Sequence, residues 1–346
     1  MISWFHQNGR DLPWRQTSDP YRIWLSEVIM QQTRVAQGRK YYERFCERFP
    51  AINNLAEAHE EEVLEIWQGL GYYSRARNLH AAAKWVMEEK EGVFPDKYEE
   101  IIKMKGVGEY TAAAVSSFAF HEDQVVVDGN VLRVFSRIFG IADDIRLPKT
   151  KKQIYDYVRN HLPLGESWNY NQSIMELGAL ICTPSQPNCQ NCPVSIFCEA
   201  RRTNRQASIP FKSKSKERRK RFLNYLLFQD GDEYLFFRRG EKDIWEGLFE
   251  PFLLETDRIF SGYEISAAVE MVAPTHEFSA FSFPVEKHIL SHQELFVAVW
   301  LIKTQGRPEI NNGRWVHEKD LAALPKPIIF SKIMGLKKGS TLPLTF

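Results

Sequence analysis

The chain has 346 residues, with 44% apolar and 26% charged side chains and a formal net charge of +1. This length predicts two domains, and a charge so close to zero indicates no class of partner. No apolar stretch is long enough to cross a bilayer, and the N-terminus does not resemble a signal peptide. These features argue against a membrane protein and a secreted one, and we expect a soluble, cytoplasmic protein.

The first part of the chain predicts one helix after another. Apolar residues recur at helical spacing in Pro20–Met30, Glu61–Trp67 and Tyr98–Met104. Glu27 lies on an apolar face of the first helix beside Trp24, where the loss of solvent favours the protonated carboxyl group. On the residues alone, an ion pair with a nearby arginine explains this glutamate equally well.

Two glycines, Gly106 and Gly108, separate the third of these helices from an alanine-rich one. Their exposed amides and the following helix N-terminus suit a phosphate group, although many such turns only join two helices. Asp128 follows an apolar run and precedes Gly129. An aspartate in this position is a turn former or a helix N-cap as often as a catalytic residue.

Four of the five cysteines lie in one short loop, at Cys182, Cys189, Cys192 and Cys198. The spacing C-x6-C-x2-C-x5-C supplies a complete ligand set for one metal centre. Structural zinc usually shows two C-x2-C pairs, and disulfides are disfavoured in a reducing compartment. We therefore predict a [4Fe–4S] cluster. The fifth cysteine, Cys46, is predicted to be a buried helix residue without a chemical role.

The segment Arg201–Arg221 is strongly basic, with ten Lys or Arg residues against Glu217 alone. Its net charge is +9, so the rest of the chain carries −8. Such a segment can lie along a phosphate backbone, or it can be a solvated linker that is kept extended by self-repulsion. Both interpretations stay open, and either one places a domain boundary here.

After this segment the pattern changes from helices to strands. Phe222–Phe228 and Tyr234–Phe237 flank the turn signal Asp230-Gly-Asp, and Glu294–Ile302 is another β-rich run. We therefore predict a multidomain protein: an all-α domain with a metal loop over 1–200, a basic linker over 201–221, and an α+β domain over 222–346.

Several motifs of the helical region resemble those of one enzyme family. The matching segments are Leu12–Trp14, Trp24–Thr33, Gly69–Asn78, the glycine hairpin, Val127–Val131 and the cysteine loop. Together they resemble the adenine DNA glycosylases of the MutY type, within the helix-hairpin-helix superfamily that includes endonuclease III. The resemblance implies a six-helix module over roughly 20–130, and an iron–sulfur module formed by the N-terminal helix and roughly 131–200.

The chemistry of base removal fits this resemblance. Release of a purine needs a proton on the departing base and an anion near the developing oxocarbenium ion. The resemblance implies that Glu27 protonates adenine at N7 and later helps to activate water, while Asp128 stabilises or captures the sugar cation. It also implies that Tyr110 and Asn130 support the site.

The resemblance also assigns residues that contact the DNA. The adenine must leave the base stack before it can react, and Gln32 and Tyr72 are expected to enter the duplex, with Tyr72 near the partner base. Tyr73 is expected in the core. Gln172 is expected to contact the edge of the adenine, although a surface position explains it as well.

The C-terminal region resembles the Nudix-like domain of these glycosylases. It lacks the Arg-Glu-x2-Glu-Glu motif that a Nudix hydrolase needs for magnesium, so we expect recognition without hydrolysis. The family's Phe-Ser-His loop corresponds to Leu290, Ser291 and His292, in which leucine replaces phenylalanine. Ser291 and His292 are the residues expected to face 8-oxoguanine.

Tyr110 distinguishes between the two nearest activities. Bifunctional relatives of endonuclease III carry a lysine at this position, which forms a Schiff base, whereas Lys105 is expected to contact phosphate or solvent. We expect a monomeric, monofunctional glycosylase acting on double-stranded DNA that contains adenine opposite 8-oxoguanine. The alternatives are an endonuclease III-type lyase and a non-catalytic iron–sulfur DNA-binding protein.

Overall fold

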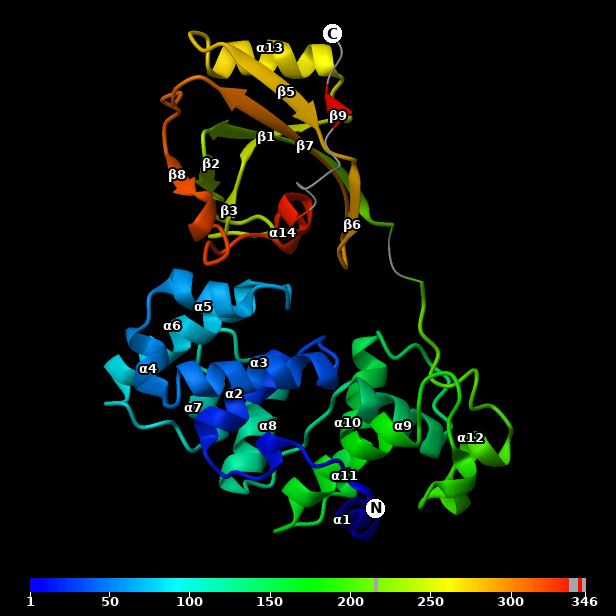
Figure 1. The fold of residues 1–346 in the computed structure, drawn as a ribbon. Helices are drawn as coiled ribbons and strands as arrows, with labels where there is room; N and C mark the ends of the chain where they lie inside the picture. Colours follow the sequence, from blue (N-terminus) through cyan, green and yellow to red (C-terminus); the bar gives the residue numbers. More distant parts are fainter. Residues whose placement is uncertain (215–216, 336–341, 344–346) are drawn as a thin grey trace. The chain divides into compact units, whose positions relative to one another are not determined.

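The computed structural model describes residues 1–214, 217–335 and 342–343 (Figure 1). The chain forms two compact units. The first comprises Met1–Glu57 and Asn78–Ser215, and the second comprises Ala58–Arg77 and Lys216–Phe346. Within the described residues, every helix is too short or too polar to span a membrane.

The first unit is helical. Its helices are α1 (Ile2–Asn8), α2 (Pro20–Met30), α3 (Val35–Arg48), α4 (Ile52–Glu57), most of α6 (Ser74–Glu89), α7 (Tyr98–Ile101), α8 (Glu109–Phe120), α9 (Gly129–Phe139), α10 (Pro148–Asn160), α11 (Ser167–Leu180) and α12 (Glu199–Arg202). Short 3-10 turns cover Pro13–Arg15 (η1), Cys189–Asn191 (η2) and Ser195–Phe197 (η3).

Helix α2 has the bounds that the sequence predicts. Asp19 is its N-cap and accepts a hydrogen bond from the Tyr21 amide, and Pro20 occupies the first turn, where its missing N–H costs nothing. Trp24 and Ile29 are fully buried. The position of Glu27 is therefore fixed by a capped helix whose neighbouring side chains lie in the core.

Helices α9, α10 and α11 surround an apolar core of this unit. It contains Val131, Phe135, Ile154, Ile174 and Leu177, with Cys182 and Cys192 packed at its margin. Helix α9 begins at the N-cap Asp128, whose side chain accepts from the Val131 amide. This core therefore connects the start of α9 with the cysteine loop.

The second unit contains α5 (Glu60–Trp67) and a nine-stranded mixed sheet with two further helices. The strands are β1 (Arg219–Asp230), β2 (Glu233–Arg238), β3 (Phe249–Glu250), β4 (Phe252–Thr256), β5 (Phe278–Ser282), β6 (Glu286–Ile289), β7 (Gln293–Thr304), β8 (Gly313–His317) and β9 (Leu342–Pro343). The helices are α13 (Gly262–Val272) and α14 (Ile328–Gly335), and η4 is a 3-10 turn over Glu318–Asp320.

The sheet runs in the order β3-β2-β1-β7-β5-β9, and its central pair, β1 and β7, is parallel. Strands β1 and β2 form the predicted hairpin, with Asp230 opposite Glu233. Alternate residues of β1 enter different cores: Tyr225 and Leu227 face one, and Leu226 and Phe228 the other. The sheet is therefore covered on both faces, which explains its long apolar strands.

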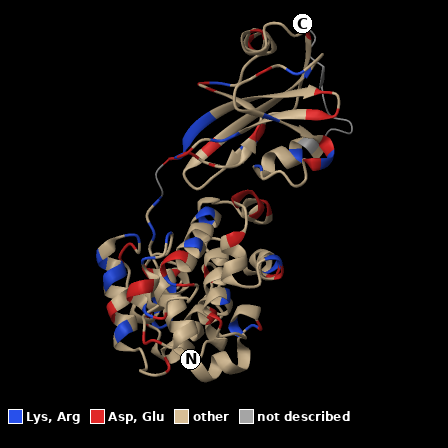
Figure 2. Cartoon of the chain, turned by 90° about the vertical axis from the view of Figure 1, so that its left-hand side faces the viewer, with Lys and Arg blue, Asp and Glu red and all other residues tan. Residues whose placement is uncertain are grey.

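The basic segment is divided among several elements. Arg201 and Arg202 belong to α12, and the Ile209 carbonyl accepts from Arg137 Nε at 2.8 Å. Strand β1 begins at Arg219, so the last basic residues lie in the sheet rather than before it (Figure 2). A count of charges did not reveal this division, because it does not show that Arg221 pairs with Asp243 and Glu255 in the second unit.

Candidate active site and cysteine cluster

One pocket of the helical unit, with a volume of about 350 Å³, collects the four predicted catalytic residues and two of the predicted DNA contacts. Its walls come from η1, α2, α8, α9 and α11. The predicted residues that line it are Glu27, Tyr110, Asp128, Asn130, Gln172 and Gln32. Residues far apart in the sequence are thus brought to one cavity, whose volume lies in the range of small-molecule sites.

Glu27 is the buried acid of this pocket. Its side chain is only 9% exposed, and Oε2 accepts a hydrogen bond from the Tyr110 hydroxyl at 2.8 Å. Burial raises the pKa of Glu27 from 4.5 to about 7, and the nearby charge of Asp128 acts in the same direction. The carboxyl group is therefore substantially protonated near neutral pH and able to donate a proton.

Asp128 is both the N-cap of α9 and a pocket residue. Its Oδ1 accepts from the Val131 amide and its Oδ2 from Asn130 Nδ2, each at 2.7 Å. Burial raises the pKa of Asp128, whereas these two donors act to lower it. The capping role and a catalytic role are therefore compatible, because the cap holds the carboxylate at the pocket wall.

Arg133 connects Asn130 with the cysteine loop. Its Nη2 donates to Asn130 Oδ1 at 2.8 Å, and its Nε donates to the Cys182 carbonyl at 2.7 Å. A Cβ atom at Gly178 would lie 2.6 Å from the Asn130 Cβ, so only glycine permits this approach of α11 to α9. The orientation of Asn130 thus depends on two residues that the motifs did not indicate.

Three further charged residues of the pocket were missed by sequence reasoning: Arg10, Arg15 and Glu176. The arginines flank the Leu12–Trp14 motif, and Glu176 lies one helical turn after Gln172. That spacing places the two α11 side chains on one face of the helix. The spacing of Gln172 and Glu176 could therefore have indicated a shared face. The arginine partners of Glu176 could not be inferred, because they are more than 160 residues away in the sequence.

Gln32 and Tyr72, the two residues predicted to enter the duplex, share an unusual backbone conformation. Their φ angles are +55° and +48°, in the left-handed region that non-glycine residues rarely occupy. Both side chains are exposed, and Tyr72 belongs to the second unit. Tyr73, in contrast, is buried, in agreement with its prediction as a core residue.

The glycine hairpin has a steric reason for its first glycine. Gly106 has a φ of +79°, and a Cβ atom there would lie 2.6 Å from the Cβ of Asn78. Gly108 is the N-cap of α8, which has no side-chain capping bond. Because no side chain caps the first amides of α8, these amides remain candidates for the predicted phosphate contact.

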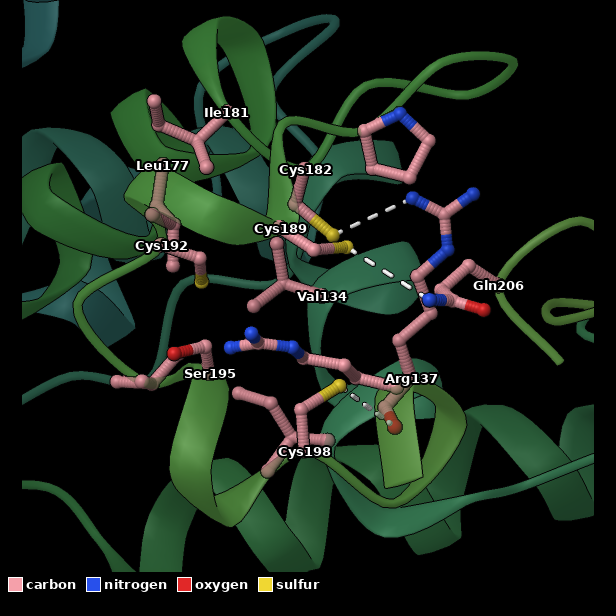
Figure 3. Close-up of a pocket in the computed structure, with 14 residues that line it drawn as sticks. Val134, Arg137, Leu177, Ile181, Cys182, Cys189, Cys192, Ser195, Cys198 and Gln206 are labelled. Carbon is pink, nitrogen blue, oxygen red and sulfur yellow. Dashed lines mark hydrogen bonds between the residues drawn. The ribbon is translucent and has the colours of Figure 1, made fainter. Parts of the chain in front are cut away.

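The four clustered cysteines surround a single pocket, as Figure 3 shows. All are free thiols, and Val134, Leu177 and Ile181 form the apolar wall around them. Arg137 Nη1 donates to the Cys182 sulfur at 3.3 Å, and Gln206 Nε2 lies 3.9 Å from the Cys189 sulfur. This set of four thiols with neighbouring donors fits the ligands of an iron–sulfur cluster.

Among the described residues, no three His, Cys, Asp or Glu side chains converge closely enough to hold one metal ion. In a four-iron cluster each thiolate binds a different iron, so its ligands surround a volume and do not converge on a point. Burial raises the pKa of the Cys192 and Cys198 thiols.

In the second unit, Ser291 and His292 form the exposed turn between β6 and β7. The Ser291 hydroxyl lies 3.1 Å from His292 Nδ1, and the Leu290 amide donates to the Gln293 carbonyl. Leu290 is partly buried against the core of the sheet. Both polar residues line a pocket of this unit together with Tyr72.

Comparison with known proteins accounts for both domains. Residues 25–160 match the HhH-GPD superfamily of base excision DNA repair proteins, and residues 224–336 match the NUDIX domain. The chain is 31% identical over 349 residues to the adenine DNA glycosylase of Buchnera aphidicola subsp. Baizongia pistaciae, covering 99% of this chain and 97% of that one. The chain belongs to the adenine DNA glycosylase family. The human adenine DNA glycosylase is 39% identical over 60% of this chain and 40% of its own length.

Solved structures resemble the helical part of the chain. A thermostable thymine-DNA glycosylase matches with a TM-score of 0.53 and 27% identity, over 58% of this chain and 93% of that one. Endonuclease III trapped covalently on DNA matches with a TM-score of 0.50 and 23% identity, over 59% and 92%, and shows the shared fold. The predictions of the family, the multidomain fold and the glycosylase class of enzyme are therefore confirmed.

Proposed function

We propose that this protein removes adenine paired with 8-oxoguanine, or with guanine, from double-stranded DNA by hydrolysis of the N-glycosidic bond. The observation that carries the proposal is the buried Glu27, whose pKa is raised to about 7 in the same pocket as Asp128. An acid that is protonated near neutral pH beside a second carboxylate is the pair that purine release needs.

Glu27 acts first as the general acid. Its proton goes to N7 of the flipped adenine, which converts the base into a neutral leaving group as the glycosidic bond breaks. The Tyr110 hydroxyl donates to Oε2, so it orients the carboxyl group and stabilises the carboxylate that proton transfer leaves behind. That carboxylate then accepts a proton from the water that attacks the sugar.

Asp128 supplies the negative charge for the sugar cation. Its carboxylate is held at both oxygens, by the Val131 amide and by Asn130, so it needs little reorganisation when the oxocarbenium ion develops. Tyr110 occupies the position at which a lyase of this superfamily carries its lysine. Since a phenol forms no imine, we propose base removal without strand cleavage.

The partner base identifies the substrate. Adenine is the same molecule opposite thymine and opposite 8-oxoguanine, so discrimination requires contacts to the opposite base. Ser291 and His292 offer polar groups in an exposed turn, and Gln32 and Tyr72 offer exposed side chains on strained backbone. Ser291 and His292 are proposed to face 8-oxoguanine. Gln32 and Tyr72 are proposed to enter the duplex after the adenine has left it, with Tyr72 near the partner base.

The four clustered cysteines are proposed to hold a [4Fe–4S] cluster. When bound, the cluster would cross-link a loop whose large apolar side chains Ile196 and Phe197 are largely exposed and add little to its own core. The chain's own contribution is Arg133, which joins the Cys182 carbonyl to Asn130. Correct folding of the loop therefore supports the pocket.

One assay tests the proposal. The purified protein is incubated with duplexes that hold adenine opposite 8-oxoguanine or opposite thymine, and strand breaks are measured with and without alkali. We expect breaks only with 8-oxoguanine and only after alkali, and a gel-filtration profile of a monomer. Breaks without alkali would indicate a lyase, and binding without any breaks would indicate a non-catalytic protein. We propose a cytoplasmic location, associated with the nucleoid in a bacterium.

A further inference from the structure

The wall of the catalytic pocket contains a fully buried carboxylate, Glu176 of α11. Its Oε1 accepts from the Arg10 amide and from Arg10 Nε, and its Oε2 accepts from Arg10 Nη2, each at 2.8 Å. Oε2 also accepts from Arg15 Nη2 at 2.9 Å. Burial would raise the pKa of Glu176, but the hydrogen bonds from both arginines outweigh it and lower the pKa to about 2. Glu176 is therefore ionised and holds two guanidinium groups.

Arg15 extends this contact to the pocket. Its Nε donates to Gln172 Oε1 at 3.0 Å, while its Nη2 is bound by Glu176. A guanidinium group has donors only, so the Gln172 atom that faces it must be the amide oxygen. The amide nitrogen of Gln172 then lies on the other side, and within the described part of the chain it has no hydrogen-bond partner.

We propose that Glu176 is a positioning residue for recognition of the flipped base. By fixing Arg15, it fixes the Gln172 amide so that Oε1 is occupied and the Nε2 donor is available to an acceptor on the base. This inference rests on the proposed function, because it assigns a role within adenine excision. The chain Glu176–Arg15–Gln172 belongs to one unit, and the two α11 members are one helical turn apart.

The ionised carboxylate is required because all four donors converge on its two oxygens. A glutamine at this position keeps the volume but has one acceptor atom, and its amide hydrogens would face the arginines. Arg15 would then lose its carboxylate partner and keep the weaker bond from Nη1 to the Arg10 carbonyl, at 3.2 Å. With Arg15 held less firmly, the Gln172 amide could turn its oxygen toward the base. If Glu176 only anchored Arg10, its substitution would affect folding, but the effect on the rate would not depend on Gln172. This difference makes the proposal testable.

The test is a double-mutant cycle with Glu176→Gln and Gln172→Ala, measured as the single-turnover rate of adenine excision opposite 8-oxoguanine. We expect Glu176→Gln to lower the rate roughly 10–100-fold, the equivalent of one hydrogen bond to a charged group. In the Gln172→Ala background, the same substitution should cause little further loss. Rate losses that multiply independently, or a wild-type rate for Glu176→Gln, would overturn the proposal.

A second variant, Arg15→Lys, tests the proposal if Glu176→Gln does not fold. Arg15→Lys keeps the charge but has a single ammonium group, which cannot bind Glu176 and Gln172 in the same fixed geometry. It should show the same lack of additivity with Gln172→Ala.

The control is Glu122→Gln, which removes a half-buried carboxylate that accepts from the Tyr98 amide. The effect of this substitution on the excision rate should be independent of Gln172. If the wild-type protein excises no adenine, the proposed function is wrong. If the wild-type protein excises adenine but the effects of the two substitutions are additive, the positioning role alone is wrong.

Discussion

Glu27→Gln is expected to separate activity from stability. The amide keeps the shape of the side chain and can still accept from Tyr110, but it has no proton to give to adenine. Loss of general acid catalysis typically costs about 10²–10⁴ in rate. We therefore expect a variant that binds the 8-oxoguanine duplex and excises adenine at least about a hundredfold more slowly.

The same substitution is expected to stabilise the fold at alkaline pH. Glu27 has a pKa of about 7 in the folded protein against an ordinary value of 4.5. At about 1.4 kcal/mol per pKa unit, this difference corresponds to about 3 kcal/mol. Because the unfolded chain loses this proton at a lower pH than the folded protein, the free energy of unfolding is highest below pH 4.5 and falls as the pH rises to about 7. Above that pH the wild-type protein carries the full destabilisation of an ionised, buried carboxylate. A glutamine at position 27 has no charge and avoids this destabilisation.

The assay is denaturant unfolding of wild type and Glu27→Gln at pH 8 and at pH 5, together with single-turnover excision. At pH 8 the variant should be more stable by about 3 kcal/mol, and at pH 5 by less than about 1 kcal/mol. Glu88→Gln, which changes an exposed carboxylate at the end of α6, should alter neither quantity. A wild-type excision rate, or a stability difference that does not change with pH, would refute the role of Glu27 as a desolvated acid.

Four other outcomes follow from the site. The wild-type single-turnover rate should fall as the pH rises through about 7, because Glu27 loses its proton there; a flat profile between pH 6 and 9 would contradict the acid role. The purified protein should be brown and contain about four irons per chain, and Cys192→Ser should lower both iron content and melting temperature; a colourless protein with one zinc would overturn the cluster. Borohydride should trap little protein–DNA adduct, since Tyr110 forms no imine, and efficient trapping would indicate a reactive lysine. Ser291→Ala with His292→Ala should slow excision opposite 8-oxoguanine much more than opposite guanine, whereas equal losses would mean that this turn supplies only general affinity.

The sequence by itself determined the elements with a local cause. Helix α2 follows from Asp19, Pro20 and its apolar spacing, and the β1–β2 hairpin follows from Asp230-Gly-Asp between two apolar runs. The clustered cysteines are equally local, because their ligand spacing lies within one loop. In each case the residues that decide the structure are close neighbours in the chain, so that propensity, capping and spacing are sufficient.

Only the tertiary structure decided the environment of the functional groups. The sequence left Glu27 open between a desolvated acid and an ion pair; its burial and the Tyr110 hydroxyl come from α2 and α8 together. Asp128 was open between cap and catalyst, and packing places the capping carboxylate in the pocket wall. The links from Arg15 to Glu176 and Gln172 join residues more than 150 positions apart. Desolvation and hydrogen bonding between distant segments depend on how the helices pack, and no local pattern in a single sequence records that.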